Sequence, residues 1–210
     1  MPPFTRTPLT PRKTPIQARS SASVEAILQA TLQVLVSVGK ERLTTTRVAQ
    51  RAGVSVGTLY QYYPNKSSLL QAALRLHMDQ VAAALDQVCT QYQNQPLLIM
   101  ADALLHAYLN AKMQHVKASA SLYSVSSDID GAAIAKAASA RGLRAVTTLF
   151  TSAPEPLTKD PTLIATVVVA SFNGIARRIL EAKSPERELE PLRTELTVLV
   201  HAYLRTCIAA

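Results

Sequence analysis

The chain has 210 residues, of which 48% are hydrophobic and 17% charged, and its formal net charge is +8. This composition excludes a disordered protein, and the lack of an uninterrupted apolar run of about 18 residues argues against a transmembrane helix. The N-terminus lacks the apolar core of a signal peptide and the two cysteines, Cys89 and Cys207, suggest no disulfide framework, so we expect a soluble, cytoplasmic protein without membrane contacts.

The positive charge is concentrated in the first third of the chain. Residues 1–66 contain nine Lys or Arg and two acidic residues, whereas residues 67–210 contain thirteen and twelve. A basic segment joined to a nearly neutral one is typical of a polyanion-binding protein, because neutralised phosphates release counterions. Charge alone does not distinguish DNA from RNA or from an anionic membrane.

Residues 1–19 are predicted to form a flexible basic arm, because they contain five prolines, four basic residues and no acidic residue. The arm could contact the DNA backbone or minor groove, or it could be a solvated tail without a role, and the sequence favours neither. From Ser20 to Val38, apolar residues recur at steps of three and four, which predicts an amphipathic helix that Gly39 ends.

Residues 43–66, LTTTRVAQRAGVSVGTLYQYYPNK, predict two short helices joined by a tight turn. Thr45 or Thr46 can cap the first helix, and Gly53 can adopt the left-handed backbone at its end. Ser55 can cap the second helix. Two helices joined by so short a turn match a helix-turn-helix, whose second helix enters the major groove of DNA.

The segment AGVSVGTLYQYYPNKSSLL resembles the signature of the TetR family of bacterial transcriptional repressors, and the likeness covers residues 20–75. It implies a DNA-binding domain over residues 20–66, followed by a helical effector-binding and dimerisation domain over residues 67–210. It also implies a homodimer that binds a palindromic operator in double-stranded DNA and releases it when a small molecule binds. By position, the resemblance implies phosphate or base contacts from Thr45, Thr46, Arg47, Ser55, Gly57, Thr58, Tyr60, Gln61, Tyr62 and Lys66.

An alternative for the tyrosines is a place in the core of three packed helices. The length of the motif favours DNA contacts for Tyr60 and Tyr62, and a core position for Tyr63, which stands where the family frequently has Phe. Gln61 occupies a position that varies within the family, so it is expected to affect the choice of operator.

The rest of the chain predicts further helices, so the fold class is all-α with about nine helices. A long fourth helix is expected from a cap at Ser67 or Ser68 to about Gln91. Two later helices are expected to begin near Asp160 and Glu190. A seventh helix is expected to be capped by Asp128.

The helix expected over residues 97–114 is apolar over much of its circumference, as a buried or cavity-lining helix would be. Asp102 and His106 share one of its faces and could be a metal half-site, an acid-base pair, a ligand contact or an ordinary surface pair. Too few ligands accompany them for a metal, and we expect no cofactor. The residues expected to line an effector pocket are Met100, Leu104, Tyr108, Tyr123 and Phe150, each equally credible as plain core, together with His106.

The last two helices are predicted to form a dimer interface, because small residues permit close approach and one subunit cannot bury every apolar face. A monomeric core is the alternative. The residues expected at the interface are Ala170, Gly174, Arg177, Leu196, Val200 and Tyr203.

The sequence thus favours a ligand-responsive DNA-binding repressor rather than an enzyme. A sequence-blind architectural DNA binder and an enzyme using Asp102 and His106 are the alternatives.

Overall fold

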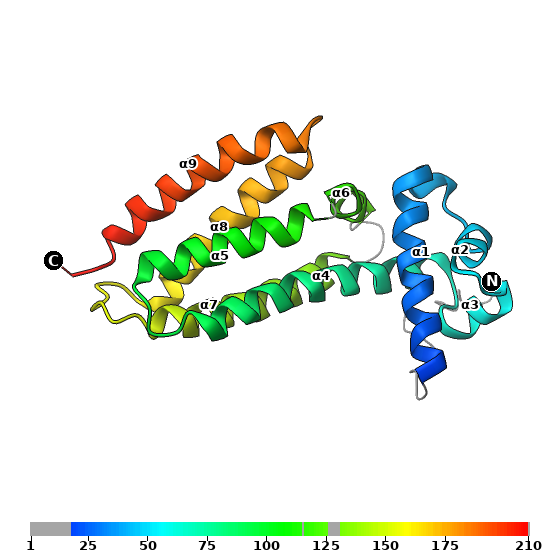
Figure 1. Ribbon diagram of the computed structural model, residues 1–210, viewed down its shortest axis with the longest axis horizontal. Coiled ribbons are helices and arrows are strands. Elements are labelled where there is room, and N and C mark those ends of the chain that lie inside the picture. Colours follow the sequence, from blue (N-terminus) through cyan, green and yellow to red (C-terminus); the bar gives the residue numbers. More distant parts are fainter. Residues whose placement is uncertain (1–17, 115, 126–130, 210) are drawn as a thin grey trace, which may run out of the picture. The chain divides into compact units, whose positions relative to one another are not determined.

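The computed structural model describes residues 18–114, 116–125 and 131–209, and it is helical over most of them. Within these ranges, β pairing is limited to an isolated antiparallel bridge between Leu157 and Ile208. The all-α prediction is confirmed. The helices, labelled in Figure 1, are α1 (Ala18–Arg42), α2 (Thr45–Ala52), α3 (Val56–Tyr62), α4 (Lys66–Gln91), α5 (Leu97–Met113), α6 (Val116–Val125), α7 (Gly131–Thr151), α8 (Pro161–Leu180) and α9 (Pro185–Arg205).

The chain divides into two compact units, and the division falls inside α4, between His77 and Met78. Of the described residues, 18–77 cluster with 120–125 and 131–134, and we call this the N-terminal unit. The described residues of 78–119 cluster with those of 135–209, and we call this the body. The first turns of α4 belong to the N-terminal unit, where they bury Leu69, Leu70 and Leu74.

The helix α1 supplies the apolar surface on which α2 packs. Its Ile27 and Leu35 are fully buried, as the apolar periodicity predicts. The helical φ and ψ angles are interrupted at Gly39 (φ 73°, ψ 171°), where the sequence predicted the end, but helical structure resumes to Arg42. At the other end α1 begins at Ala18, so the last residues of the predicted arm are helical; residues 1–17 lie outside the described part.

Two predicted helix caps are wrong by one to three residues. Thr44, and not Thr45 or Thr46, caps α2: its backbone is extended and its hydroxyl accepts from the N–H of Arg47 at 3.2 Å. At the start of α4 the cap is Asn65, whose Oδ1 accepts from the N–H of Ser68 at 2.8 Å. Ser68 returns a bond, because its Oγ accepts from the N–H of Asn65 at 3.3 Å.

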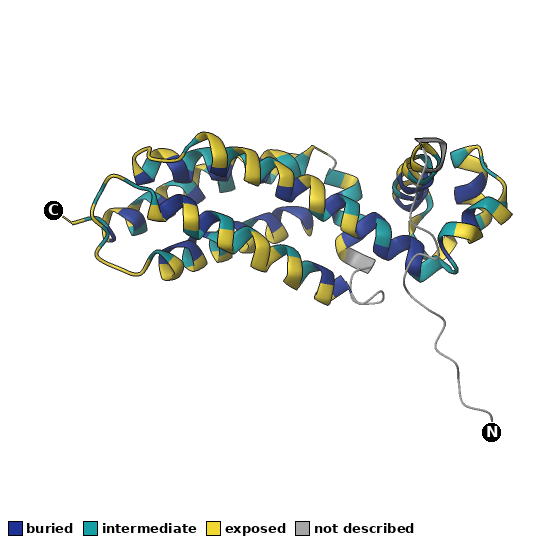
Figure 2. Cartoon of the chain, turned by 90° about the horizontal axis from the view of Figure 1, so that it is seen from below, coloured by how far each residue is buried: buried dark blue, intermediate teal, exposed yellow. Residues whose placement is uncertain are grey.

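The core of the body is formed chiefly by the facing sides of α5, α7, α8 and α9, whose buried residues appear dark blue in Figure 2. Phe150 on α7 is among the largest fully buried side chains. The N-terminus of α5 has no cap from its own sequence, but the carboxylate of Glu155 accepts from the N–H of Leu97, with oxygens at 3.1 and 3.2 Å.

The start of α9 corrects a second prediction. Asp160 caps α8 as expected, accepting from the N–H of Leu163 at 3.1 Å. However, α9 begins at Pro185 rather than near Glu190, because Pro185 with acidic residues after it fits a first turn equally well. Pro191 therefore lies inside α9. Asp128, the cap expected for α7, is outside the described residues.

Two helices, α1 over Ser21–Arg42 and α8, are long and apolar enough to cross a membrane by length and composition alone. Both instead pack on another helix of their own unit, α1 on α2 and α8 on α9.

Candidate nucleic-acid interface

The turn between α2 and α3 is fixed by backbone bonds that close the end of α2. Gly53 has a left-handed backbone (φ 69°, ψ 28°). Its N–H donates a hydrogen bond to the carbonyl of Gln50 at 3.3 Å, and the N–H of Val54 donates one to the carbonyl of Ala49 at 3.0 Å. This is the Schellman arrangement. Ser55 then caps α3, accepting from the N–H of Thr58 at 2.9 Å, as predicted. The geometry is that of a helix-turn-helix.

The second helix of this motif turns its polar side chains outward. Of the seven residues of α3, all of them described, only Leu59 is buried. Tyr60 is 41% exposed, Gln61 is exposed, and Thr58 and Tyr62 are half-buried. Figure 2 accordingly shows α3 mostly in yellow and teal. Hydroxyl and amide groups in this position can reach phosphates and base edges.

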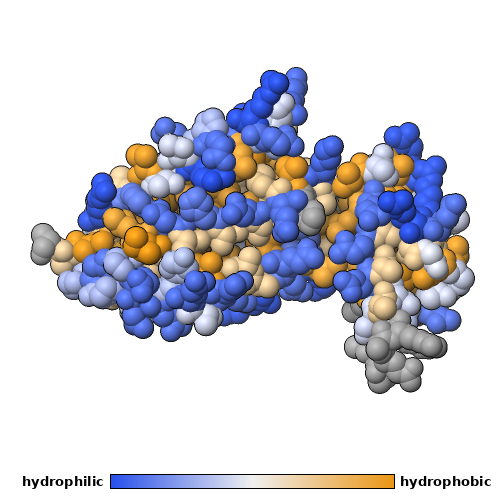
Figure 3. All heavy atoms as spheres, viewed as in Figure 1, coloured by the Kyte–Doolittle hydropathy of each residue, from blue (hydrophilic) through white to orange (hydrophobic). Residues whose placement is uncertain are grey.

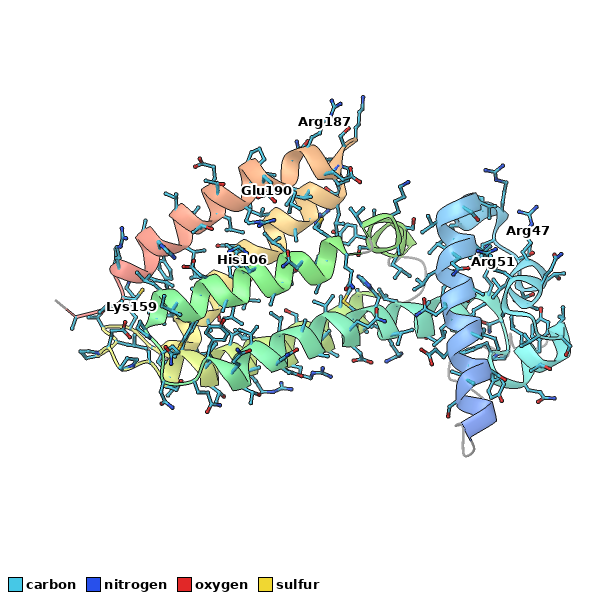
Figure 4. All side chains as sticks on the ribbon, in the orientation of Figure 1. Arg47, Arg51, His106, Lys159, Arg187 and Glu190 are labelled. Atoms are coloured by element: carbon cyan, nitrogen blue, oxygen red, sulfur yellow. The ribbon has the colours of Figure 1, made fainter. Side chains whose placement is uncertain are left out.

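The exposed residues of α2 lie beside this helix. The Oγ1 of Thr45 is 3.0 Å from the hydroxyl oxygen of Tyr60, which joins α2 to α3 at the surface. Thr46 and Arg47 are exposed. The guanidinium of Arg47 donates to the carbonyl of Arg42 at 3.0 Å, and Figure 4 shows this side chain at the outer side of α2. Arg51 instead bonds the amide oxygen of Gln33 on α1 at 2.6 Å.

Lys66 has a structural contact that the sequence did not reveal. Its Nζ donates to the carbonyl of Lys40, near the end of α1, at 2.6 Å. An ammonium has three N–H donors, so two remain for a phosphate. The same side chain can therefore close α1 and bind DNA.

Tyr63 belongs to the core, as predicted, since it is 3% exposed. Burial raises the pKa of its phenol to about 12, with a smaller contribution from the neighbouring Tyr62. Gly57, in contrast, is exposed, and a Cβ placed there would meet only Ser55 Oγ, at an ordinary 3.7 Å. The space around Gly57 in the described part of the N-terminal unit would therefore admit a larger residue.

The six residues expected to line an effector pocket are not all together. Met100, Leu104 and Phe150 are fully buried in the core of the body, and Tyr108 is nearly so. His106 is exposed on α5 and is labelled in Figure 4. Tyr123 is 37% exposed and lies on the part of α6 that clusters with the N-terminal unit.

Asp102 pairs with a histidine that the sequence did not suggest. Its Oδ1 lies 2.7 Å from Nε2 of His201 on α9, a residue 99 positions away. Asp102 and His106 both lie in the described part of the chain, and no hydrogen bond joins their side chains there. In residues 18–114, 116–125 and 131–209, no group of three His, Cys, Asp or Glu side chains is placed to hold a metal ion.

Two of the predicted interface residues, Leu196 and Val200, are each 2% exposed and so belong to the core of their own chain. Ala170, Gly174 and Arg177 are exposed along α8, and Tyr203 is half-buried beneath the ammonium of Lys159, 5.0 Å from its ring centroid. The large apolar side chains that do reach the surface here are Leu163 (52% exposed), Val198 (59%) and Leu199 (54%).

These three residues lie at one end of the α8–α9 pair. The segment before α8 and the segment after α9 are joined by the Leu157–Ile208 bridge and by bonds from Thr158 to Cys207 and from Ala209 to Pro156, both 2.9 Å. The start of α8 therefore lies beside the end of α9. In Figure 3, hydrophobic residues are visible at the surface of the body between hydrophilic ones.

Two family models match this chain. The model described as bacterial regulatory proteins, tetR family, matches residues 27–73, which contain the helix-turn-helix. The model described as tetracyclin repressor-like, C-terminal domain, matches residues 96–204, more than half of the chain.

Named relatives match parts of the chain. The chain is 41% identical over 71 residues to the HTH-type transcriptional repressor KstR of Mycolicibacterium smegmatis, which covers 32% of this chain and 35% of that protein. It is 46% identical over 48 residues to the tetracycline repressor protein class C of Escherichia coli, covering 23% and 22%. Each alignment thus spans about a third or less of the relative's length.

Solved structures share the fold over nearly the whole chain. A TetR-family transcriptional regulator from Streptomyces coelicolor has a TM-score of 0.63 at 21% identity, covering 89% of this chain and 99% of that one. SmeT, the repressor of the Stenotrophomonas maltophilia multidrug efflux pump SmeDEF, has a TM-score of 0.67 at 18% identity, covering 90% and 92%. Because the helix-turn-helix and the helical body each match their own family model, the chain belongs to the TetR family of bacterial regulatory proteins.

Proposed function

We propose that this protein is a cytoplasmic transcriptional repressor that inserts α3 into the major groove of an operator. The observation that carries the proposal is the outward polar surface of α3, with Leu59 turned inward and Tyr60 and Gln61 turned out. Arg47 and Lys66 add positive charge beside it. Lysine and arginine at the edge of such a helix hold phosphates and fix its register on the duplex.

The operator would be palindromic, because the protein would bind as a dimer. Leu163 on α8 and Val198 and Leu199 on α9 are exposed apolar side chains, and the small residues Ala170 and Gly174 of α8 are exposed as well. Such side chains are buried when two copies pair about a twofold axis. The two α3 helices would then read half-sites about 34–36 Å apart.

The body would bind a small-molecule effector that opposes DNA binding. Its candidate ligand contacts are the residues of α5 and α7 named above, among which Tyr108 carries a polar group within an apolar surface. The effector changes the affinity for the operator by the same factor by which the operator changes the affinity for the effector. An effector that favours the DNA-free state must therefore bind more weakly to the DNA-bound protein.

The test is selection of genomic DNA fragments by the purified full chain, followed by fluorescence anisotropy on the recovered sequence. We expect a palindromic site whose affinity exceeds that of random duplex at least about a thousandfold. Gln61→Ala should change the ranking of operator variants, whereas Arg47→Ala should weaken binding to all of them and lower the salt dependence. Failure to recover any preferred sequence would refute the repressor proposal.

A second candidate is the sequence-blind architectural DNA binder that the sequence also allowed. The same anisotropy experiment separates the two functions, because a sequence-blind architectural binder holds random and genomic duplexes with similar affinity.

A further inference from the structure

Lys112 lies on the face of α5 that otherwise points into the core of the body. Met100, Leu104, Tyr108 and Lys112 follow one another at steps of four, so they share one face of the helix. The first two are fully buried, Tyr108 is nearly buried and Lys112 is half-buried. An ammonium at the end of an apolar stripe is costly unless a partner compensates its charge.

The partner present in the structure is an aromatic ring. The Nζ of Lys112 lies 5.8 Å from the centroid of the Tyr108 ring, within the range of a cation–π contact. Among the residues that the structure describes, no Asp or Glu forms an ion pair with Lys112. Burial accordingly lowers the pKa of Lys112, because its charged form loses water without gaining an anion.

Asn173 on α8 brings further donors to this place. The hydroxyl of Tyr108 donates to the amide oxygen of Asn173 at 2.6 Å, and Phe172 stacks on the same tyrosine at 5.9 Å between ring centroids. The bond uses the amide oxygen, so the two N–H donors of Asn173 are directed elsewhere. Asn173 is exposed, which makes the cluster accessible from solvent.

We propose that Lys112 and Asn173, which both contact Tyr108, bind an organic oxyanion, a carboxylate or phosphate carried on an apolar molecule. The head group would pair with the ammonium of Lys112 and accept from the Asn173 amide, which are donors that an oxyanion satisfies and a cation cannot. This anion would be the effector of the repressor, and only that identification rests on the proposed function.

The backbone at Lys112 links the site to the next helix. The Oγ of Ser119, in the first turn of α6, donates to the carbonyl of Lys112 at 2.8 Å. A head group that fixes the end of α5 therefore also fixes the start of α6.

The test uses three probes of equal chain length, decanoate, decyl phosphate and decanol, titrated into the full chain without DNA by isothermal calorimetry. We expect at least one of the two anions to bind and decanol not to compete with it. Lys112→Met should weaken anion binding at least about tenfold, since a charge-assisted contact is lost. Lys117→Met, which removes an exposed lysine from α6, should leave it unchanged.

Equal binding of decanol and the anions would overturn the proposal, as would unchanged affinity in Lys112→Met or no binding of either anion. A preference between the two anions identifies the head group. Because the titration contains no DNA, its outcome is independent of operator binding. A protein that binds the anion but no duplex would disprove the proposed function alone, and the reverse result would disprove the anion site alone.

Discussion

The hydroxyl of Thr45 on α2 and the phenol of Tyr60 on α3 are bonded across the turn at 3.0 Å, on the surface that faces away from the core. The bond holds Tyr60 in one orientation before DNA arrives. We expect Tyr60→Phe and Thr45→Val each to weaken operator binding by about 0.5–1.5 kcal/mol, the usual value of one hydrogen bond. Anisotropy titrations measure these losses.

The double variant completes the experiment. Because the two hydroxyls act through one bond, the combined loss should be smaller than the sum of the single losses. Fully additive losses would mean that each residue contacts DNA independently of the other.

Gly57→Ala is expected to separate stability from DNA affinity. Alanine fits the local space and favours a helix over glycine by up to about 1 kcal/mol, so urea unfolding should shift to higher concentration. Operator affinity should fall, because the added methyl group holds the helix away from the duplex. If affinity rises with stability, the backbone at this residue does not approach DNA.

Glu155→Ala should destabilise the body by about 1 kcal/mol, the cost of a lost helix cap, because the N–H of Leu97 loses its acceptor. Glu155→Gln keeps one acceptor oxygen and should cost less. Chemical denaturation measures both, with Glu195→Ala on the exposed side of α9 as the control. A variant at Glu155 no less stable than this control would contradict the assigned cap.

The buried phenol of Tyr63 should make the protein less stable at alkaline pH. Its phenol ionises near pH 10 when unfolded but only near about 12 when folded, so the neutral form is favoured by folding. Stability from this group is fully present below about pH 10 and is lost as the pH rises toward 12. In Tyr63→Phe, the free energy of unfolding should fall by roughly 1–2 kcal/mol less over this pH range than in the unaltered protein. Unfolding midpoints of Tyr63→Phe and of the unaltered protein should differ by a constant amount below about pH 9, and this difference should change above that pH. If the two curves stay parallel above about pH 9, Tyr63 is not the group whose ionisation destabilises the protein.

The dimer is tested at the apolar surface of α8 and α9. Leu163→Glu combined with Leu199→Glu should convert a dimer to a monomer in light scattering, because burying two carboxylates at an interface is strongly unfavourable. Val36→Glu, at an exposed apolar residue of α1, is the matched control and should leave the dimer intact.

Local chemistry made the helix-turn-helix predictable. The signals for α2 and α3 lie within a few residues of the structures they specify, as Gly53 and Ser55 illustrate. The cap of α2 was misplaced because Thr44, Thr45 and Thr46 carry equivalent hydroxyls, and only backbone angles select among them.

The start of α9 was misplaced for a similar reason. Pro185 and Pro191 both have acidic neighbours, and the sequence offers no rule for choosing between them.

Contacts between distant residues were beyond sequence reasoning. Asp102 with His201 and Leu97 with Glu155 depend on how whole helices pack. Apolar periodicity located the buried side of α9 but did not say whether it faces its own chain. For that reason Leu196 was assigned to an interface although it lies in the core, and Leu199, whose side chain is exposed, was not.

Because Lys66 bonds the carbonyl of Lys40 and is also expected to hold a phosphate, acetylation of this lysine would change two interactions at once. Acetylation would replace its ammonium with a neutral amide, which both removes the attraction for phosphate and weakens the closure of α1. A single acetyl group would thereby switch off operator binding with the body left untouched, and acetylated molecules should be missing from the fraction retained on DNA.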